Sequence, residues 1–173
     1  IVTRSGLTDL EGRTAKRTKT TGCGQGTVFG DLMDEIDRLP LPAGATLTRA
    51  ALYDLLDRVR LHETIYKQSG AVHGCGLATN AGDASEILMF VEDVGRHNAV
   101  DAIAGRMWLD RLDGGDKIFY TTGRLTSEMV IKCAQMEIPF LVSRSGLTQM
   151  GHEIATKVGM TMIGRATHRH FLL

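Results

Sequence analysis

The sequence predicts an α/β protein in which helices cover a mostly parallel mixed sheet. Short apolar runs of strand length alternate with stretches of helical periodicity from about residue 86 onward, a pattern typical of parallel sheets whose crossovers are helices. The chain has 173 residues, of which 43% are hydrophobic, and this is enough for one compact domain with a substantial core. We therefore expect a single α/β domain over residues 1–173.

The N-terminal part carries few signals of regular structure. A basic run at 13–19 precedes a glycine-rich segment around Cys23, and Pro40 and Pro42 mark a connector. Glycine-rich segments have little to hold them in one conformation. Residues 20–45 are therefore expected to form a mobile cysteine-containing loop and a connector.

The first predicted helix begins at Thr46 or Thr48. After this start, apolar residues recur at three- and four-residue spacing, which is the period of one helix face. They are Ala51, Leu52, Leu55, Leu56 and Val59. The continuous apolar run 87–91 then predicts a buried strand.

The remaining elements alternate regularly. Helical periodicity over 100–112 ends at Gly114-Gly115, and 117–121 predicts the next strand. A helix at 127–136 is ended by Pro139, since proline lacks the N–H that a helix needs. Residues 140–143 predict a strand, 148–158 a helix with Gly159 as its C-terminal cap, and 160–163 a final strand.

Composition argues against several classes of protein. The formal net charge is zero, which argues against binding to nucleic acid through bulk charge. No stretch approaches the roughly 20 apolar residues of a membrane span. The three cysteines are too few and too scattered for a disulfide framework, so a reducing cytoplasm is the simplest location.

Three strand-to-helix junctions each combine glycine, arginine and small polar residues: 92–98, 121–127 and 143–148. The segment 164–170 after the last strand has the same character. In a parallel sheet such junctions lie at the carboxyl ends of the strands, where ligands bind, and helix N-termini and arginine suit anions. The alternative is a set of helix caps with solvated arginines, but their number favours an anion or nucleotide site.

The cysteines differ in context. Cys23 has glycine neighbours and a basic run upstream, which suits a reactive thiolate; the alternative is an incidental thiol in a loop. Cys75 forms a His-x-Cys pair with His73, and a zinc site would need further ligands, of which His168 and His170 could supply two. Cys133 is interpreted as a core residue. The pair Glu92-Asp93 is interpreted as a helix cap or an ion-pair partner of Arg96 rather than an acid–base catalyst.

Several motifs together resemble the formate dehydrogenase accessory sulfurtransferase family (FdhD). The most specific is Glu92-Asp93-Val94-Gly95-Arg96-His97-Asn98-Ala99-Val100-Asp101. Gly123–Val130 resembles the family's Ser-Gly-Arg-x-Ser-x-Glu-Met segment, and Gly70–His73 resembles its Gly-Gly-x-His element. Ile138-Pro139 and Ser143–Ser145 follow in the family order. Members usually carry an additional N-terminal region, so this chain is expected to lack that region.

The resemblance implies a cytidine-deaminase-like fold, a three-layer α/β/α sandwich without the deaminase zinc site. It implies a cytoplasmic homodimer with no tightly bound metal of its own. Its partners would be a cysteine desulfurase and formate dehydrogenase, with no nucleic-acid or membrane partner. The protein would carry sulfur as a cysteine persulfide to the bis-(molybdopterin guanine dinucleotide) molybdenum cofactor, for which guanine nucleotide is a mimic.

The resemblance also assigns roles to residues. Cys23 matches the first cysteine of the family's Cys-Gly-x-Cys loop, while Gly26 stands in place of the second, which leaves a carrier with a single loop thiol. The implied cofactor-binding residues are Arg165, Ala166, Thr167, His168, Arg169, His170, Gly123, Arg124, Ser127, His73, Arg96 and His97.

Two other functions remain open from the sequence. One is a chaperone that binds the cofactor without covalent sulfur chemistry and does not use Cys23. The other is a zinc-dependent deaminase-like hydrolase, which the absence of His-x-Glu followed by Cys-x-x-Cys disfavours.

Overall fold

The computed structural model describes residues 17–19, 27–29, 41, 44–62 and 64–173. The chain divides into two compact units, Ile1–Arg38 and Leu39–Leu173. The described residues of the first unit are β1 (Arg17–Lys19) and β2 (Thr27–Phe29), which pair antiparallel. Neither strand was predicted, and β2 lies within the segment 20–45 that was expected to be a mobile loop and connector. Cys23 and most of that segment lie outside the described residues, and the single domain over 1–173 stays a prediction.

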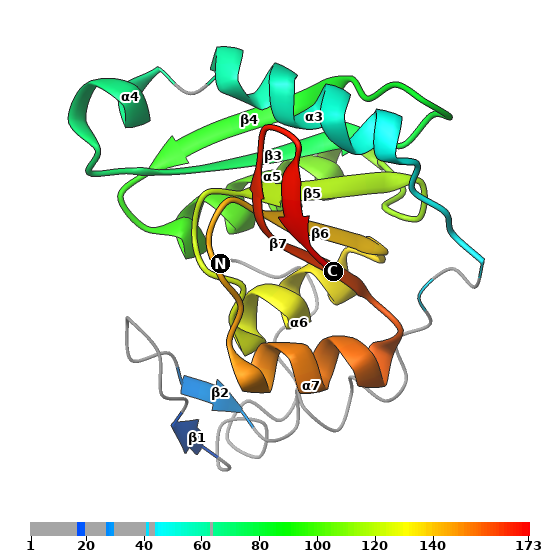
Figure 1. The fold of residues 1–173 in the computed structure, drawn as a ribbon. Helices are drawn as coiled ribbons and strands as arrows, with labels where there is room; N and C mark the ends of the chain where they lie inside the picture. The colour runs from blue at the N-terminus through cyan, green and yellow to red at the C-terminus, as the bar shows by residue number, and fades with distance from the viewer. Residues whose placement is uncertain (1–16, 20–26, 30–40, 42–43, 63) are drawn as a thin grey trace. The chain divides into compact units, whose positions relative to one another are not determined.

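The second unit is an α/β fold (Figure 1). Its elements in chain order are α3 (Arg49–His62), α4 (Ile65–Ser69), β3 (His73–Thr79), β4 (Ile87–Asp93), α5 (Arg96–Asp110), β5 (Lys117–Thr121), α6 (Ser127–Gln135), β6 (Phe140–Ser143), α7 (Gln149–Val158), β7 (Thr161–Thr167) and β8 (His170–Leu172). Every element predicted between Thr46 and Ile163 is present. The structure adds α4, β3 and β8, and it extends β7 to Thr167. Among the described helices none is long and apolar enough to cross a membrane.

The six strands form one mixed sheet in the order β4-β3-β5-β6-β7-β8. β5, β6 and β7 are parallel neighbours, and β3 is antiparallel to both β4 and β5, so β4 runs in the same direction as β5. β8 is antiparallel to β7. Four of the six strands therefore share one direction, which confirms the mixed α/β sheet expected from the sequence.

β3 was not predicted because its sequence, His-Gly-Cys-Gly-Leu-Ala-Thr, has little strand propensity. Its glycines are explained by the neighbouring strand. A Cβ on Gly74 would lie 2.7 Å from Cζ of Phe90, and one on Gly76 would lie 3.1 Å from its Cδ2. The Phe90 ring thus packs directly against the β3 backbone at the two glycines. This tertiary packing compensates for the weak strand propensity of the β3 sequence.

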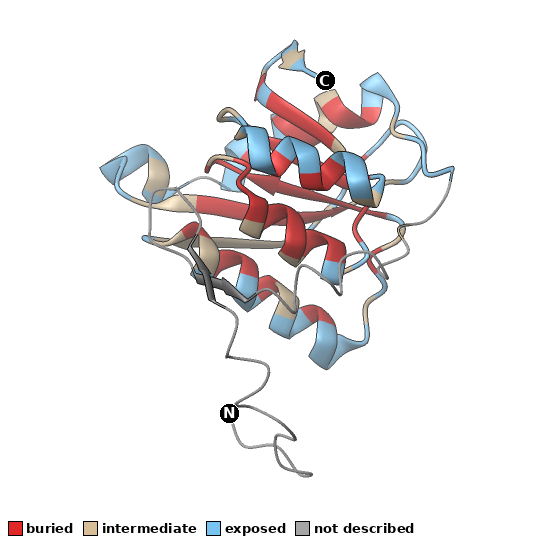
Figure 2. Cartoon of the chain, turned by 90° about the horizontal axis from the view of Figure 1, so that it is seen from below, coloured by how far each residue is buried: buried red, intermediate tan, exposed pale blue. Residues whose placement is uncertain are grey.

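Helices cover both faces of the sheet. On one face, α3 buries Leu52, Leu55 and Leu56 against alternate strand residues such as Ile118 and Val142. On the other face, α5 packs on β3 and β4, and α6 and α7 pack on each other. The longer helices are buried along one side and exposed along the other (Figure 2). This is the expected three-layer arrangement.

Gly114 is required by close packing rather than by its conformation. A Cβ there would lie 1.8 Å from the backbone oxygen of Met136. We predict that Gly114→Ala lowers the free energy of unfolding by about 2 kcal/mol, because backbone must move to relieve the overlap. Gly105→Ala is the matched control: nothing lies within 4 Å of its Cβ, and alanine favours a helix interior by about 0.5–1 kcal/mol. Urea unfolding followed by circular dichroism measures the free energy of unfolding of both variants. Equal free energies of unfolding for Gly114→Ala and Gly105→Ala would contradict the packing argument.

Candidate functional site

The loops that follow β5 and β6 and the last part of β7 are hydrogen-bonded to one another. Leu125 N donates to the Gly146 oxygen (3.0 Å), Thr148 N donates to the Leu125 oxygen (3.0 Å), and Arg165 N donates to the Ser145 oxygen (2.8 Å). Three segments that the sequence singled out therefore meet at the carboxyl-end edge of the sheet, as the parallel arrangement requires.

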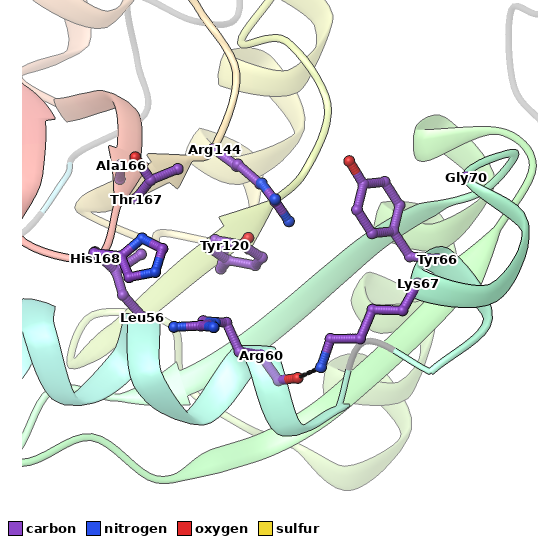
Figure 3. Close-up of a pocket in the computed structure, with 10 residues that line it drawn as sticks. All are labelled: Leu56, Arg60, Tyr66, Lys67, Gly70, Tyr120, Arg144, Ala166, Thr167 and His168. Atoms are coloured by element: carbon purple, nitrogen blue, oxygen red, sulfur yellow. Dashed lines mark hydrogen bonds between the residues drawn. The ribbon is translucent and has the colours of Figure 1, made fainter.

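A pocket of about 380 Å³ lies at this edge, on the face that α3 covers. Ten residues line it, from α3, α4 and the ends of β5, β6 and β7: Leu56, Arg60, Tyr66, Lys67, Gly70, Tyr120, Arg144, Ala166, Thr167 and His168. Figure 3 shows the longer side chains arranged around an open centre. Its volume lies in the range of small-molecule sites.

The pocket lining is strongly basic. Arg60, Lys67 and Arg144 contribute three cations, and none of the described residues that line it is Asp or Glu. The Arg144 guanidinium carbon lies 5.3 Å from the centroid of the Tyr66 ring, and Lys67 Nζ donates to the Arg60 backbone oxygen. Arginine over an aromatic ring is a cation–π contact, so the pocket offers both charge and an aromatic surface to a ligand.

The structure divides the C-terminal segment 165–170 between two surfaces. Ala166, Thr167 and His168 line the pocket. Arg165, Arg169 and His170 do not; they line a separate hollow beside Phe171 and Leu172. Arg169 is also held locally, since its guanidinium lies 4.6 Å from the Tyr53 ring centroid and 3.3 Å from Asp57 Oδ2.

The other predicted binding residues gather at the β5–α6 junction. Gly123 lies under Arg96 and His73, because a Cβ there would be 2.6 Å from Arg96 Cδ and 3.4 Å from His73 Nδ1. His97 Nε2 lies 3.1 Å from Glu128 Oε2. Arg124 and the buried Ser127 belong to the same junction.

We call this group, His73, Arg96, His97, Gly123, Arg124, Thr126 and Ser127, the junction cluster. Several of its buried polar atoms lack a hydrogen-bond partner in the part of the chain that the structure describes: His73 Nδ1, His97 Nδ1, Arg124 Nη2 and Thr126 Oγ1. Buried polar groups are nearly always paired in proteins, so such a concentration indicates a place for a polar ligand.

The two described cysteines are core residues. The Cys75 thiol is buried, donates to the Thr121 hydroxyl at 3.3 Å, and burial raises its pKa to about 11. Cys133 is fully buried, and burial raises its pKa well above the ordinary value. The core interpretation of Cys133 is confirmed. Over residues 44–62 and 64–173, no group of three or more His, Cys, Asp or Glu side chains is placed to hold a metal ion.

The carboxylates of the Glu92-Asp93 pair lie near the starts of two helices, but only Glu92 binds N–H groups of a helix, so the capping interpretation holds for Glu92. Asp93 Oδ1 accepts from Gly95 N (2.7 Å) and Asn98 Nδ2 (3.0 Å) at the start of α5. Glu92 instead accepts from the first residues of α4, which is distant in sequence. Partial burial alone would raise the pKa of Glu92, but the hydrogen bonds from Tyr66, Ile65 and Thr64 outweigh it and lower the pKa below its ordinary value.

Comparison with known proteins identifies the family. The model of the FdhD/NarQ family matches residues 1–173. The chain belongs to the FdhD/NarQ family. It is 31% identical over 151 residues to the protein of Wolinella succinogenes named sulfur carrier protein FdhD, covering 87% of this chain and 51% of that protein. A protein of the same name from Xanthomonas axonopodis is 33% identical over 148 residues, covering 84% and 51%.

A solved structure of an FdhD/NarQ relative supports the fold. The formate dehydrogenase accessory protein from Desulfotalea psychrophila superposes with a TM-score of 0.69 at 32% identity, covering 92% of this chain and 69% of that one. The chain spans about half the length of the curated relatives it matches. The family membership inferred from the motifs is thus confirmed.

Sequence reasoning missed the pocket residues of α3 and α4. Arg60 follows Leu56 by one helical turn, so the helical period places it beside the buried stripe. Tyr66 and Lys67 gave no such signal, because α4 is five residues long and has no buried side chain. Arg144 was part of a predicted junction but was not assigned to binding.

The junction cluster makes stability dependent on pH. Burial and, next, the charge of Arg96 lower the pKa of His73 below the ordinary 6.5. The unfolded chain therefore takes up this proton at a higher pH than the folded chain, so the free energy of unfolding falls as pH drops below about 6.5. We predict that His73→Asn makes this fall shallower between about pH 7 and 5.5 in urea unfolding experiments. An unchanged slope would show that His73 does not titrate differently on folding.

Proposed function

We propose that this chain is a sulfur carrier that accepts persulfide sulfur from a cysteine desulfurase on Cys23. It delivers this sulfur to the bis-molybdopterin guanine dinucleotide cofactor for the maturation of formate dehydrogenase. The relatives named sulfur carrier protein FdhD support the transfer role, and the Desulfotalea protein supports the link to formate dehydrogenase. The proposed setting is a cytoplasmic homodimer without a nucleic-acid or membrane partner.

The proposed role of Cys23 rests on the burial and the pKa values of the other two cysteines. A thiol accepts sulfur as a thiolate, which requires access and a pKa that is not raised. Cys75 and Cys133 are fully buried and have raised pKa values. Since the chain has three cysteines, Cys23 is the remaining candidate. In the loading step, the Cys23 thiolate attacks the terminal sulfur of the desulfurase persulfide, a new S–S bond forms, and the desulfurase thiolate leaves.

The basic pocket is the proposed site for the guanine dinucleotide part of the cofactor. Arg60, Lys67 and Arg144 would face its phosphates, and the Tyr66 ring offers a surface for stacking. Ala166, Thr167 and His168 lie across the pocket from Tyr66 and Lys67 (Figure 3). The junction cluster would meet a second polar part of the same cofactor through its unpartnered buried atoms. Arg165, Arg169 and His170 remain proposed contacts from the adjoining hollow.

Sulfur loading of Cys23 is directly testable. We predict that the protein gains the mass of one sulfur atom after incubation with a cysteine desulfurase and cysteine, and that Cys23→Ala abolishes this gain. Cys133→Ala, which removes a buried thiol, should still be loaded. In cells, Cys23→Ala should also abolish formate dehydrogenase maturation. Maturation that survives Cys23→Ala would refute the carrier.

Nucleotide binding is expected to depend on the pocket cations. We predict that GDP binds to the wild-type protein and that Arg144→Ala weakens this binding by about tenfold, the effect of losing a charged hydrogen-bonding partner. Arg106→Ala is the control, because this arginine pairs with Asp110 on α5 (2.5 Å). Isothermal titration calorimetry measures the affinity of each variant for GDP. An equal loss of affinity in Arg144→Ala and Arg106→Ala would contradict a specific role for the pocket.

A second candidate is a chaperone that binds the cofactor without covalent chemistry. The described residues that line the basic pocket supply cations and the Tyr66 ring, which bind a nucleotide without a thiol, and none of them is a cysteine. The Cys23→Ala variant separates the two functions: retained GDP binding with lost maturation supports the carrier, while retained binding with full maturation supports the chaperone.

A further inference from the structure

One wall of the basic pocket is a short helix with little packing of its own. α4 contributes Tyr66 and Lys67 to the lining, and Gly70 follows it. The helix is five residues long, and none of its residues is buried. A single turn of helix is unstable by itself, so contacts to neighbouring elements must hold these two side chains in place.

Glu92 supplies the densest of these contacts. Its Oε2 accepts hydrogen bonds from Ile65 N (3.0 Å), Thr64 Oγ1 (3.0 Å) and Thr64 N (3.3 Å), and its Oε1 accepts from Tyr66 N (2.8 Å). The carboxylate therefore binds the otherwise unpaired N–H groups at the start of α4, where a negative charge is also favoured by the helix dipole.

Glu92 itself belongs to a strand of the sheet. It lies near the end of β4, and its backbone is paired with Gly74 of β3. It does not line the pocket. Tyr66 connects the two regions, because its backbone N–H is held by Glu92 while its ring lies under the Arg144 guanidinium.

We propose that Glu92 is a positioning residue for guanine nucleotide binding: it anchors α4 to the sheet so that Tyr66 and Lys67 face the ligand. The inference rests on the proposed nucleotide site. A carboxylate inside a pocket for phosphates would repel the ligand, whereas this one acts from behind the wall and binds only the helix. The effect is preorganisation, which lowers the entropy lost when a ligand binds.

The test compares Glu92→Gln with Glu86→Gln, a neutralised glutamate on the exposed segment just before β4. We expect Glu92→Gln to weaken GDP binding by about tenfold, since charge-assisted bonds to α4 are lost, and Glu86→Gln to leave it unchanged. In Glu92→Gln, amide hydrogen–deuterium exchange at residues 64–66 should be faster than in the wild-type protein. Exchange in β4 should be the same in both. Sulfur loading of Cys23 should persist in both variants.

A double-mutant cycle identifies the route of the effect. If Glu92 acts through Tyr66, GDP binding by the double variant Glu92→Gln/Tyr66→Ala should be little weaker than binding by Tyr66→Ala alone. Fully additive losses would contradict this route. If Glu92→Gln proves too unstable to study, Thr64→Ala removes only the hydroxyl bond to Oε2 and should give a smaller loss of affinity with faster exchange at the same residues.

The outcomes separate this inference from the proposed function. A wild-type protein that does not bind GDP contradicts both. Wild-type binding that Glu92→Gln and Thr64→Ala leave unchanged contradicts the inference alone and leaves the nucleotide site intact.

Discussion

The insertion of β3 between β4 and β5 is the constraint on which the rest of the site depends. It is possible because Gly74 and Gly76 leave room for the Phe90 ring across the strand. The resulting register places Gly74 beside Glu92 on one side, and Cys75 beside Thr121 on the other. Because α4 immediately precedes β3 in the chain, the same register brings the start of α4 within reach of the Glu92 carboxylate.

The end of β5 separates two chemically different surfaces. Tyr120 faces α3 and lines the basic pocket. Its neighbour Thr121 faces the opposite way and accepts a hydrogen bond from the Cys75 thiol, on the side of the junction cluster. Successive strand residues point to opposite faces, so the cationic pocket and the cluster of unpartnered polar atoms lie on two faces at one edge. Under the proposed function, the two surfaces would bind different polar parts of the dinucleotide cofactor.

The motifs and the pocket lining were predictable to different degrees. The junction residues Arg96, Gly123 and Arg124 could be proposed from the sequence because glycine and arginine at strand ends have a direct chemical meaning. Tyr66 and Lys67 could not be proposed in this way, because a five-residue helix is too short to show a periodic pattern. The helix also owes its position to the carboxylate of Glu92, which lies 26 residues after Tyr66 in the chain. β3 was missed for a related reason, since its strand conformation depends on Phe90 rather than on its own residues.

The sequence by itself determined the alternation of strands and helices, the family, and the identity of the cysteines and the junction motifs. These follow from local patterns, because burial of one face imposes a period on each element. Only the tertiary structure decided which strands are neighbours, which three residues of the segment 165–170 line the pocket, and which helix Glu92 caps. Those features depend on contacts between residues distant in sequence, such as Phe90 with Gly74 and Glu92 with Tyr66, and no local pattern of residues encodes them.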